Sequence, residues 1–206
     1  MAGYIYMVVF QALTWEARDS GDEHLISIFG KTEEGKSVCV TTEFKPYFFV
    51  KLPRGTEQGD VELLYDKLET MKKGCLTGYS LTKQKDVWGF QNNEEFFFMQ
   101  LTFKNLESRR KVNSVFMYND AFRKYHVYES NIDPVLRLMH RTGIQSTGWL
   151  DTGTRCVRSH LANVNLDIWC NDWTELKPVN RDDIAPFVVA SFDIECNSST
   201  GKFPDP

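Results

Sequence analysis

The amino-acid sequence predicts an α+β protein in which antiparallel β-sheet dominates over helix. Aromatic residues, fifteen Phe among them, make up 14% of the 206 residues, and aromatic side chains favour strands. Apolar runs of strand length fill residues 4–52, and between residues 44 and 130 such runs alternate with two helical patterns. Near the end of the sequence, an apolar run over residues 187–191 leads into two acidic residues, Asp193 and Glu195.

Residues 4–52 predict an antiparallel meander of four strands. A polar turn at residues 31–36, which contains Gly35, separates the second strand from the third. Pro46 lies inside the fourth run and cannot donate a ladder hydrogen bond, so we expect that portion at a sheet edge or a bulge. The expected strands are Tyr4–Trp15, His24–Phe29, Ser37–Thr42 and Phe44–Leu52.

Residues 44–130 follow the order strand–helix–strand–strand–helix–strand, which is the split βαβ arrangement of ferredoxin-like folds. The first helix is predicted from apolar residues at helical spacing and ends at Gly74. The second helix begins after Asn105, a suitable N-cap residue. The apolar positions are Val61, Leu64, Leu68 and Met71 in the first helix, and Leu106, Val112, Val115 and Phe116 in the second. The strands between and after them are Tyr79–Val87, Glu95–Phe103 and Tyr125–Tyr128.

RNA-recognition modules share this topology and stack bases on aromatic side chains of a central strand. Here Phe96, Phe97 and Phe98 are consecutive, so their side chains point to both faces of the strand. We therefore interpret these three residues as core residues.

Residues 131–176 predict one connecting helix and two further strands. The helix begins at Asp133-Pro134, an N-cap acid followed by proline at the first helical position, and ends at Gly143. The strands are Gln145–Trp149 and Val164–Trp169, joined by a polar connection over residues 151–160. Lys177–Asp183 is the predicted linker, so we expect one domain over residues 1–180 and the start of a second over residues 181–206.

Composition bounds the class of protein. The net charge of −4 and the pI of about 5.6 argue against a free-standing nucleic-acid binder, although they leave room for a basic groove. The five cysteines are scattered without a C-x-x-C pair, which fits reduced thiols in cytosol or nucleus and no zinc site. No stretch approaches the ~18 apolar residues of a membrane span, and the run at residues 4–10 lacks the features of a signal peptide.

Asp193 and Glu195 are the candidate catalytic and metal-binding residues. Side chains alternate along a strand, so both carboxylates would project from one face, about 6–7 Å apart. Paired acids at the end of a buried strand are suited to hold divalent metal ions for attack on a phosphodiester. The plainer interpretation is a pair of solvated acids, or an aspartate that caps a turn.

Basic residues offer weaker candidates for phosphate contacts. Lys45 and Arg54 are isolated, and isolated surface cations are usually only solvated. Arg109-Arg110-Lys111 would spread over about 200° of a helix, which favours a solvated face over a phosphate clamp.

Three blocks of the sequence together resemble the N-terminal part of family B DNA polymerases, closest to the eukaryotic delta type and its relatives in large DNA viruses. Asp-Ile-Glu alone is a weak signal, whereas three blocks in this order at these spacings are a strong one. The first block covers residues 28–40 and 44–49, the second residues 128–139 with Gly148-Trp149, and the third residues 184–196 and 201–206.

The resemblance implies that Asp193-Ile194-Glu195 is the first motif of a 3′→5′ proofreading exonuclease domain with an RNase H-like fold. In that family the matching acids bind two Mg²⁺ ions, one of which activates the attacking water. The preceding region would be the polymerase N-terminal domain, which helps to position template and single-stranded DNA. The partners implied are template–primer DNA, a single-stranded 3′ end, dNTPs and a sliding clamp or accessory subunits. The implied location is the nucleus, or a host nuclear or cytoplasmic replication site for a viral protein.

The remaining exonuclease motifs and all polymerase motifs of the family do not occur in these residues. We therefore expect a piece of a longer polymerase chain, inactive by itself. Two alternatives stay open, a stand-alone RNase H-like 3′→5′ exonuclease and a non-catalytic module that binds single-stranded nucleic acid or a partner.

Overall fold

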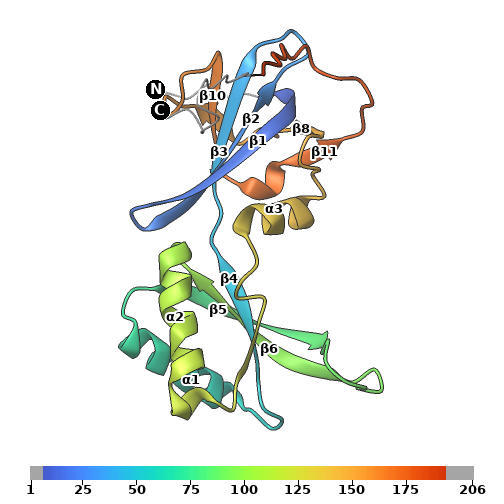
Figure 1. The fold of residues 1–206 in the computed structure, drawn as a ribbon. Coiled ribbons are helices and arrows are strands. Elements are labelled where there is room, and N and C mark those ends of the chain that lie inside the picture. The colour runs from blue at the N-terminus through green and yellow to red at the C-terminus, as the bar shows by residue number, and fades with distance from the viewer. Residues whose placement is uncertain (1–6, 194–206) are drawn as a thin grey trace, which may run out of the picture.

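The computed structural model describes residues 7–193, which form two lobes, one above the other in Figure 1. The upper lobe holds a seven-stranded sheet, and the lower lobe holds a four-stranded sheet with two helices. The chain passes from the upper lobe to the lower between β3 (Ser37–Glu43) and β4 (Tyr47–Lys51), and it returns through α3 (Pro134–Thr142). This α+β architecture is the predicted fold class.

The upper sheet has the order β11-β8-β1-β2-β3-β10-β9. Its ladders are antiparallel except that β10 runs parallel to β3, which is possible because the whole lower lobe lies between these strands in sequence. β1 and β2 pair antiparallel with Gly30 opposite Ala12. Glycine is required there, because a Cβ would lie 2.0 Å from the Gln11 carbonyl oxygen. The other strands are β1 (Val9–Ser20), β2 (Glu23–Lys31), β8 (Trp149–Asp151), β9 (Cys156–Arg158), β10 (Leu166–Cys170) and β11 (Lys177–Val179).

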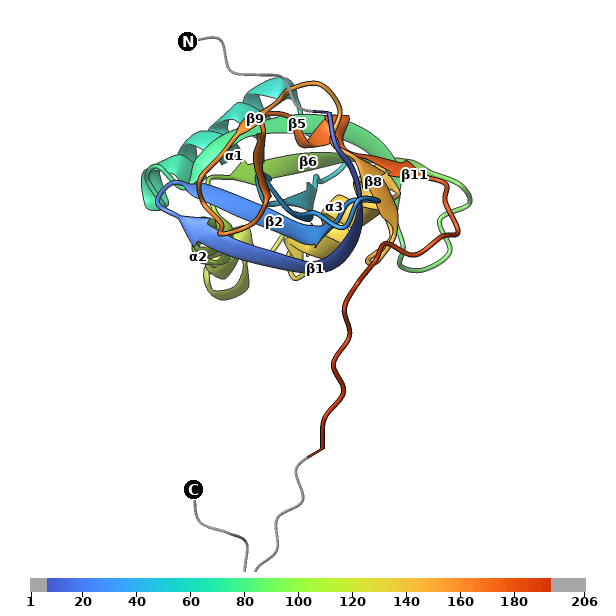
Figure 2. The same cartoon turned by 90° about the horizontal axis from the view of Figure 1, so that it is seen from above.

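The lower sheet has the order β5-β6-β4-β7 with every neighbouring pair antiparallel. With a helix after β4 and another after β6, this is the split βαβ arrangement that the sequence predicts. Figure 2 shows the molecule from above. The remaining elements are α1 (Gln58–Met71), β5 (Leu76–Lys85), β6 (Glu95–Phe103), α2 (Leu106–Tyr118), the 3-10 helix η1 (Asp120–Phe122) and β7 (His126–Tyr128).

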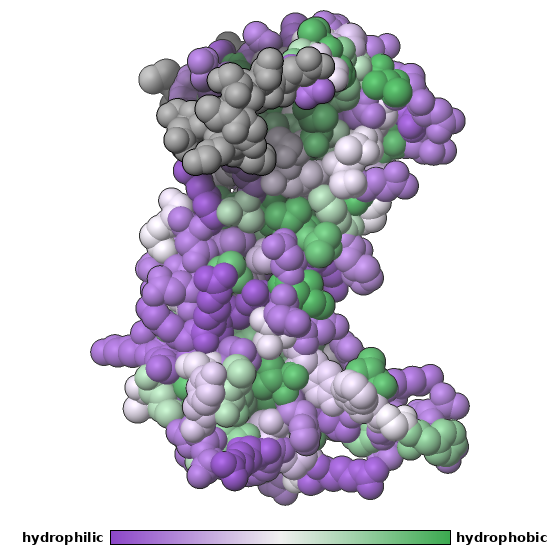
Figure 3. Space-filling model, in the orientation of Figure 1, coloured by the Kyte–Doolittle hydropathy of each residue, from purple (hydrophilic) through white to green (hydrophobic). Residues whose placement is uncertain are grey.

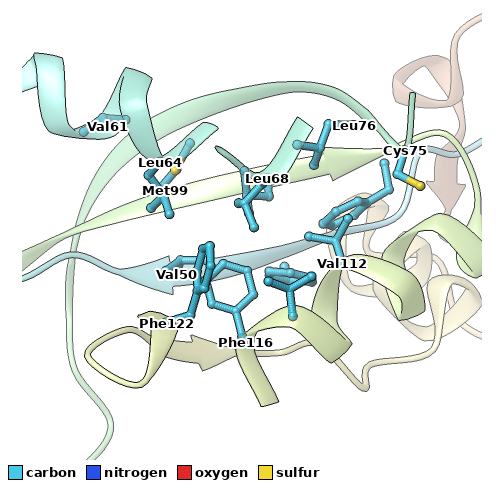
Figure 4. Packing of buried hydrophobic residues seen from close by; sticks show 14 of the residues in the cluster. Val50, Val61, Leu64, Leu68, Cys75, Leu76, Met99, Val112, Phe116 and Phe122 are labelled. Atoms are coloured by element: carbon cyan, nitrogen blue, oxygen red, sulfur yellow. The ribbon is translucent and has the colours of Figure 1, made fainter. Parts of the chain in front are cut away.

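The lower core lies between the two helices and one face of this sheet. Leu64 and Leu68 from α1 and Phe116 from α2 point toward Val50 and Met99 of the strands, as Figure 4 shows. These five side chains are buried. The predicted apolar face of each helix is therefore the face that packs on the sheet, except that Met71 at the end of α1 is 44% exposed and Leu106 at the start of α2 is only partly buried.

α3 lies at the junction of the two lobes. Asp133 caps it by accepting a hydrogen bond from the Val135 amide at 2.7 Å, and Gly143 ends it at a φ of 75°. Leu138 is buried in the upper core, whereas the Arg137 guanidinium stacks 4.1 Å from the Tyr47 ring of the lower sheet. One helix thus packs on both lobes. The 3-10 helix η2 (Trp173–Glu175) precedes β11.

Several predicted elements need correction. β4 belongs to the lower sheet and not to the meander, and it is paired on both sides. Pro46 precedes β4, where its missing N–H is harmless, and its carbonyl accepts from the Phe103 amide at 2.9 Å. It therefore sits at neither an edge nor a bulge. The first strand reaches Ser20 instead of Trp15, and its predicted start falls partly outside the described residues.

Three short strands were also mispredicted. Residues 145–148 form a turn closed by a hydrogen bond from the Gly148 amide to the Gln145 carbonyl, so the strand begins only at Trp149. β9 lies inside the predicted polar connection, and β11 lies inside the predicted linker. Pro178 is compatible with β11 because that strand is at the sheet edge.

Candidate functional site

The segment that leads to the two acids is not the buried strand that the sequence predicts. Residues 187–193 have no regular secondary structure, and Val188 is 91% exposed. The end of the described chain extends away from the body of the protein in Figure 2. An apolar run becomes a strand only where a neighbouring strand completes its hydrogen bonds, and no strand among residues 7–193 pairs with it.

The two acids have different status in the structure. Asp193 is exposed at the end of this segment, and Glu195 lies outside the described residues. Carboxylate oxygens are the donors that Mg²⁺ prefers. Within residues 7–193, however, no group of three or more His, Cys, Asp or Glu side chains is arranged to hold a metal ion. The described residues therefore do not make up a two-metal site by themselves, and the roles of Asp193 and Glu195 remain predictions.

The residues just before this segment are fixed to the upper lobe. The Trp149 indole donates a hydrogen bond to the Asp183 carbonyl at 2.7 Å. The Ala185 amide donates to the Gln11 side-chain oxygen at 2.7 Å, and Ala185 is buried. Lys31 donates to the Pro186 carbonyl at 3.2 Å. These contacts join the end of the predicted linker at Asp183 to β8, and the residues that follow it, Ala185 and Pro186, to β1 and β2.

Arg181 adds charged contacts to this arrangement. We call Gln11, Trp149 and Arg181, together with the groups they bind, the clamp. The Arg181 guanidinium stacks 4.0 Å from the Trp149 ring and donates to Glu33 at 3.0 Å and to Asp183 at 2.5 Å. The hydrogen bond from Arg181 lowers the pKa of the Asp183 carboxyl below its usual value, and the two carboxylates raise the pKa of Arg181. Arg181 and Asp183 are therefore both charged near neutral pH, and the charged part of the clamp is an ion-pair network around the Trp149 ring.

The clamp limits where Asp193 can lie. The Pro186 carbonyl accepts a hydrogen bond from Lys31 of the upper lobe, and Pro186 packs beside the turn at Gly35. Asp193 lies seven positions further along the chain, which gives a reach of at most about 25 Å from Pro186. Gln11, Trp149 and Arg181 are therefore the residues that hold the segment before Asp193 on the upper lobe. The sequence indicates Trp149 as a core or domain-interface residue, whereas Gln11 and Arg181 were not singled out, because their partners lie far away along the chain.

The basic candidates have structural partners. Lys45 lies 3.9 Å from Glu43, and Arg54 pairs with Glu94 at 2.5 Å. Arg109 is buried, contrary to the predicted solvated face, and its guanidinium donates to the Ile132 carbonyl at 2.7 Å. This bond ties α2 to the loop before α3. The triplet is therefore no phosphate clamp.

The predicted core role of the three phenylalanines is partly confirmed. Phe96 and Phe98 are buried, whereas Phe97 is about half exposed. The two buried rings lie on the face of the sheet opposite α1 and α2, where Phe98 packs against Tyr128 and the Lys51 ammonium covers Phe96 at 3.6 Å. They are therefore not open for base stacking.

Comparison with known proteins finds similarity to DNA polymerases along most of the chain and to one family model in its C-terminal part. Residues 125–206 match the family described as DNA polymerase family B, exonuclease domain. The chain is 33% identical to a DNA polymerase of Pyramimonas orientalis virus over 96% of its own length, which is 18% of that protein. It is 27% identical to the DNA polymerase delta catalytic subunit of Dictyostelium discoideum over 88% of its length, which is 19% of that protein.

The fold agrees with a solved structure. A family B DNA polymerase from the hyperthermophilic archaeon Pyrobaculum calidifontis superimposes with a TM-score of 0.65 and 17% identity, covering 87% of this chain and 21% of that one. At this identity the likeness concerns the fold alone. The chain spans about a fifth of the length of these relatives. No helix within residues 7–193 is long and apolar enough to cross a membrane.

Proposed function

The chain is homologous to the N-terminal portion of viral and delta-type family B DNA polymerases, and from this premise we propose that it is part of a replicative DNA-directed DNA polymerase with a 3′→5′ proofreading exonuclease. The observation that carries the proposal is the match to the Pyramimonas orientalis virus polymerase over 96% of the chain. The relatives are polymerases, which favours this function over a stand-alone exonuclease.

Asp193 and Glu195 are the residues that we assign to proofreading. Their carboxylates would supply part of the ligand set for Mg²⁺, and further acids of the exonuclease domain would complete it. When bound, Mg²⁺ neutralises phosphate charge and lowers the pKa of a bound water. The contribution of this chain is to hold the two carboxylates within reach of the upper lobe through the clamp around Trp149.

The exposed apolar run supports this assignment. Val188, Val189 and Phe192 are all largely exposed in the described structure. Burying one such side chain fully contributes about 1.5–3 kcal/mol, so the run has a strong tendency to pair with further strands. We propose that residues 187–192 form a strand of the exonuclease sheet once those strands are present. The boundary at residues 180–181 would then separate the N-terminal domain from the exonuclease domain.

The substrates and location follow from the same proposal. The parent enzyme would act on template–primer DNA and dNTPs, with single-stranded 3′ ends as the exonuclease substrate. A sliding clamp or accessory subunits would be its partners. It would work in a nucleus or at a viral replication site.

A chimaera tests the function. Residues 1–206 would replace the corresponding 18% of the Pyramimonas orientalis virus polymerase. The chimaera should extend a primer and shorten a mismatched 3′ end in Mg²⁺. Asp193→Ala and Glu195→Ala should each abolish the shortening and keep primer extension, which also reports correct folding. Asp182→Ala, an exposed acid of the linker, is the matched control. Equal 3′ shortening by Asp193→Ala and Asp182→Ala would refute the assignment.

A further inference from the structure

A β-hairpin projects from the lower lobe, and we call residues 81–97 the hairpin arm (Figure 1). The last pair between β4 and β6 is Lys51 with Phe98. Beyond that pair the Leu52 amide still donates to the Phe97 carbonyl at 2.9 Å, and after it β5 and β6 pair only with each other, through Gln84 with Phe96 and Lys85 with Glu95. The end of the arm is thus separated from the body of the sheet.

Two ion pairs hold the arm in place. Lys51 contacts Asp86 at 2.5 Å, and Arg54 contacts Glu94 at 2.5 Å. The Tyr128 hydroxyl also donates to Asp86 at 3.0 Å. Lys51 is the last residue of β4 and Arg54 lies in the loop between β4 and α1, so the body of the lobe neutralises two of the three acids of the arm. Glu95 is the third.

The end of the arm presents aromatic rings to solvent. Trp88 is 75% exposed and Phe90 is 93% exposed, while Phe97 is half exposed farther along β6. Figure 3 shows light-green hydrophobic residues at the end of this projection. Large exposed aromatic side chains that cluster on a fixed hairpin are typical of a binding surface.

The cations of the arm remain available for a partner. Lys83 lies with its ammonium 5.1 Å from the Phe97 ring, and Lys85 donates only to the Asn93 side chain at 3.2 Å. Neither lysine forms an ion pair within the part of the chain that the structure describes. Asp86 and Glu94 are paired, so the charges of the arm without an ion pair in the described residues are those of Lys83, Lys85 and Glu95; the two lysines outnumber the one acid, and the arm favours an anionic partner.

We propose that the hairpin arm binds single-stranded nucleic acid, with bases stacked on Trp88 and Phe90 and phosphates held by Lys83 and Lys85. Flat rings beside ammonium groups match the alternation of base and phosphate in a single strand. A duplex hides its base faces, so the exposed rings favour the unpaired strand. This proposal rests on the proposed function and deepens it, because it names residues that would hold the unpaired strand at a surface that needs neither a metal ion nor Asp193.

The arm can be tested by fluorescence anisotropy of the full chain with a labelled oligothymidylate of about 15 nucleotides. Trp88→Ala/Phe90→Ala should raise the Kd about thirtyfold or more, because it removes two stacks that contribute ~1 kcal/mol or more each. Met117→Ala/Tyr118→Ala, which removes exposed side chains of α2, should leave the Kd unchanged. Circular dichroism would confirm that both variants are folded.

Two further variants test the role of the lysines and the independence of this surface from Asp193. Lys83→Gln/Lys85→Gln should lower the slope of log Kd against log salt by about 1.4, the value for two phosphates on a single strand. Asp193→Asn should bind as wild type, so loss of proofreading and loss of arm binding are distinguishable. Absence of oligonucleotide binding by the wild-type chain would overturn the proposal. Equal Kd values for the arm variant and the α2 variant would also overturn it. That includes the outcome in which the arm variant alters self-association of the chain but not the Kd for the oligonucleotide.

Discussion

The Trp149 indole nitrogen lies 2.7 Å from the carbonyl oxygen of Asp183. The Asp183 carboxylate accepts a hydrogen bond from the Arg181 guanidinium, which stacks on the same indole ring. Trp149 is thereby held by a hydrogen bond to a backbone carbonyl and by the charged side chain stacked on its ring. Since Trp149 belongs to the upper sheet, this arrangement joins the segment before the two acids to a strand that is itself buried. These contacts of Trp149 therefore fix the point at which the segment that leads to Asp193 leaves the upper lobe.

Removing the indole donor should release the segment. Trp149→Phe keeps an aromatic ring for Arg181 but leaves the Asp183 carbonyl without its partner, which costs about 1 kcal/mol of the free energy of unfolding. The Ala185 amide should then exchange with deuterium several times faster, as measured by NMR. Trp88→Phe on the hairpin arm is the control and should leave this amide unchanged. Unaltered Ala185 exchange in Trp149→Phe would show that the indole does not hold the segment.

Local signals account for the elements that the sequence predicted correctly. Asp133-Pro134 and Asn105 define helix starts through bonds made within three residues, so α2 and α3 were found with their caps. The order of strands and helices over residues 44–130 also follows from local periodicity, because each helix shows one apolar face.

Long-range pairing accounts for the elements that the sequence mispredicted. β8, β9 and β11 have three residues each, too few for a recognisable pattern, and they exist because a neighbouring strand lies alongside. The run at residues 187–191 shows the converse, because a pattern that indicates burial does not create the partner that buries it. The clamp of Gln11, Trp149 and Arg181 joins residues up to 174 positions apart and leaves no local signal.

The lower core should be the more sensitive side of α1. Leu68 is fully buried between α1 and the sheet (Figure 4), so Leu68→Ala removes apolar contacts and leaves a cavity. We expect the free energy of unfolding to fall by about 2–5 kcal/mol in a urea titration. Leu63→Ala on the exposed face of the same helix should change it by less than about 0.5 kcal/mol. Similar losses from the two variants would contradict the packing described.

Asp86 should make the stability depend on acid pH. The hydrogen bond from Lys51 lowers its pKa from 3.8 to about 2, and its side chain is 5% exposed. Because the folded pKa is below the unfolded one, the stabilisation is present above about pH 4 and is lost as the pH falls toward 2. The difference in free energy of unfolding between wild type and Asp86→Asn should therefore shrink over that range in urea titrations. Asp66→Asn, at an exposed position on α1, is the control, and a pH-independent Asp86→Asn difference would refute the coupling.

The 206-residue chain should not degrade DNA by itself. Asp193 and Glu195 supply two carboxylates on one short segment, and a two-metal site needs acids from several elements to hold both ions. A 3′-mismatched, 5′-labelled oligonucleotide incubated with the chain and Mg²⁺ or Mn²⁺ should therefore keep its length on a denaturing gel. The chimaeric polymerase serves as the positive control for the substrate. The contrary result is that the 206-residue chain shortens the oligonucleotide, with the activity lost in Asp193→Ala and kept in Asp182→Ala. That pattern requires a metal-dependent activity through Asp193, so it would mean that the site is already complete.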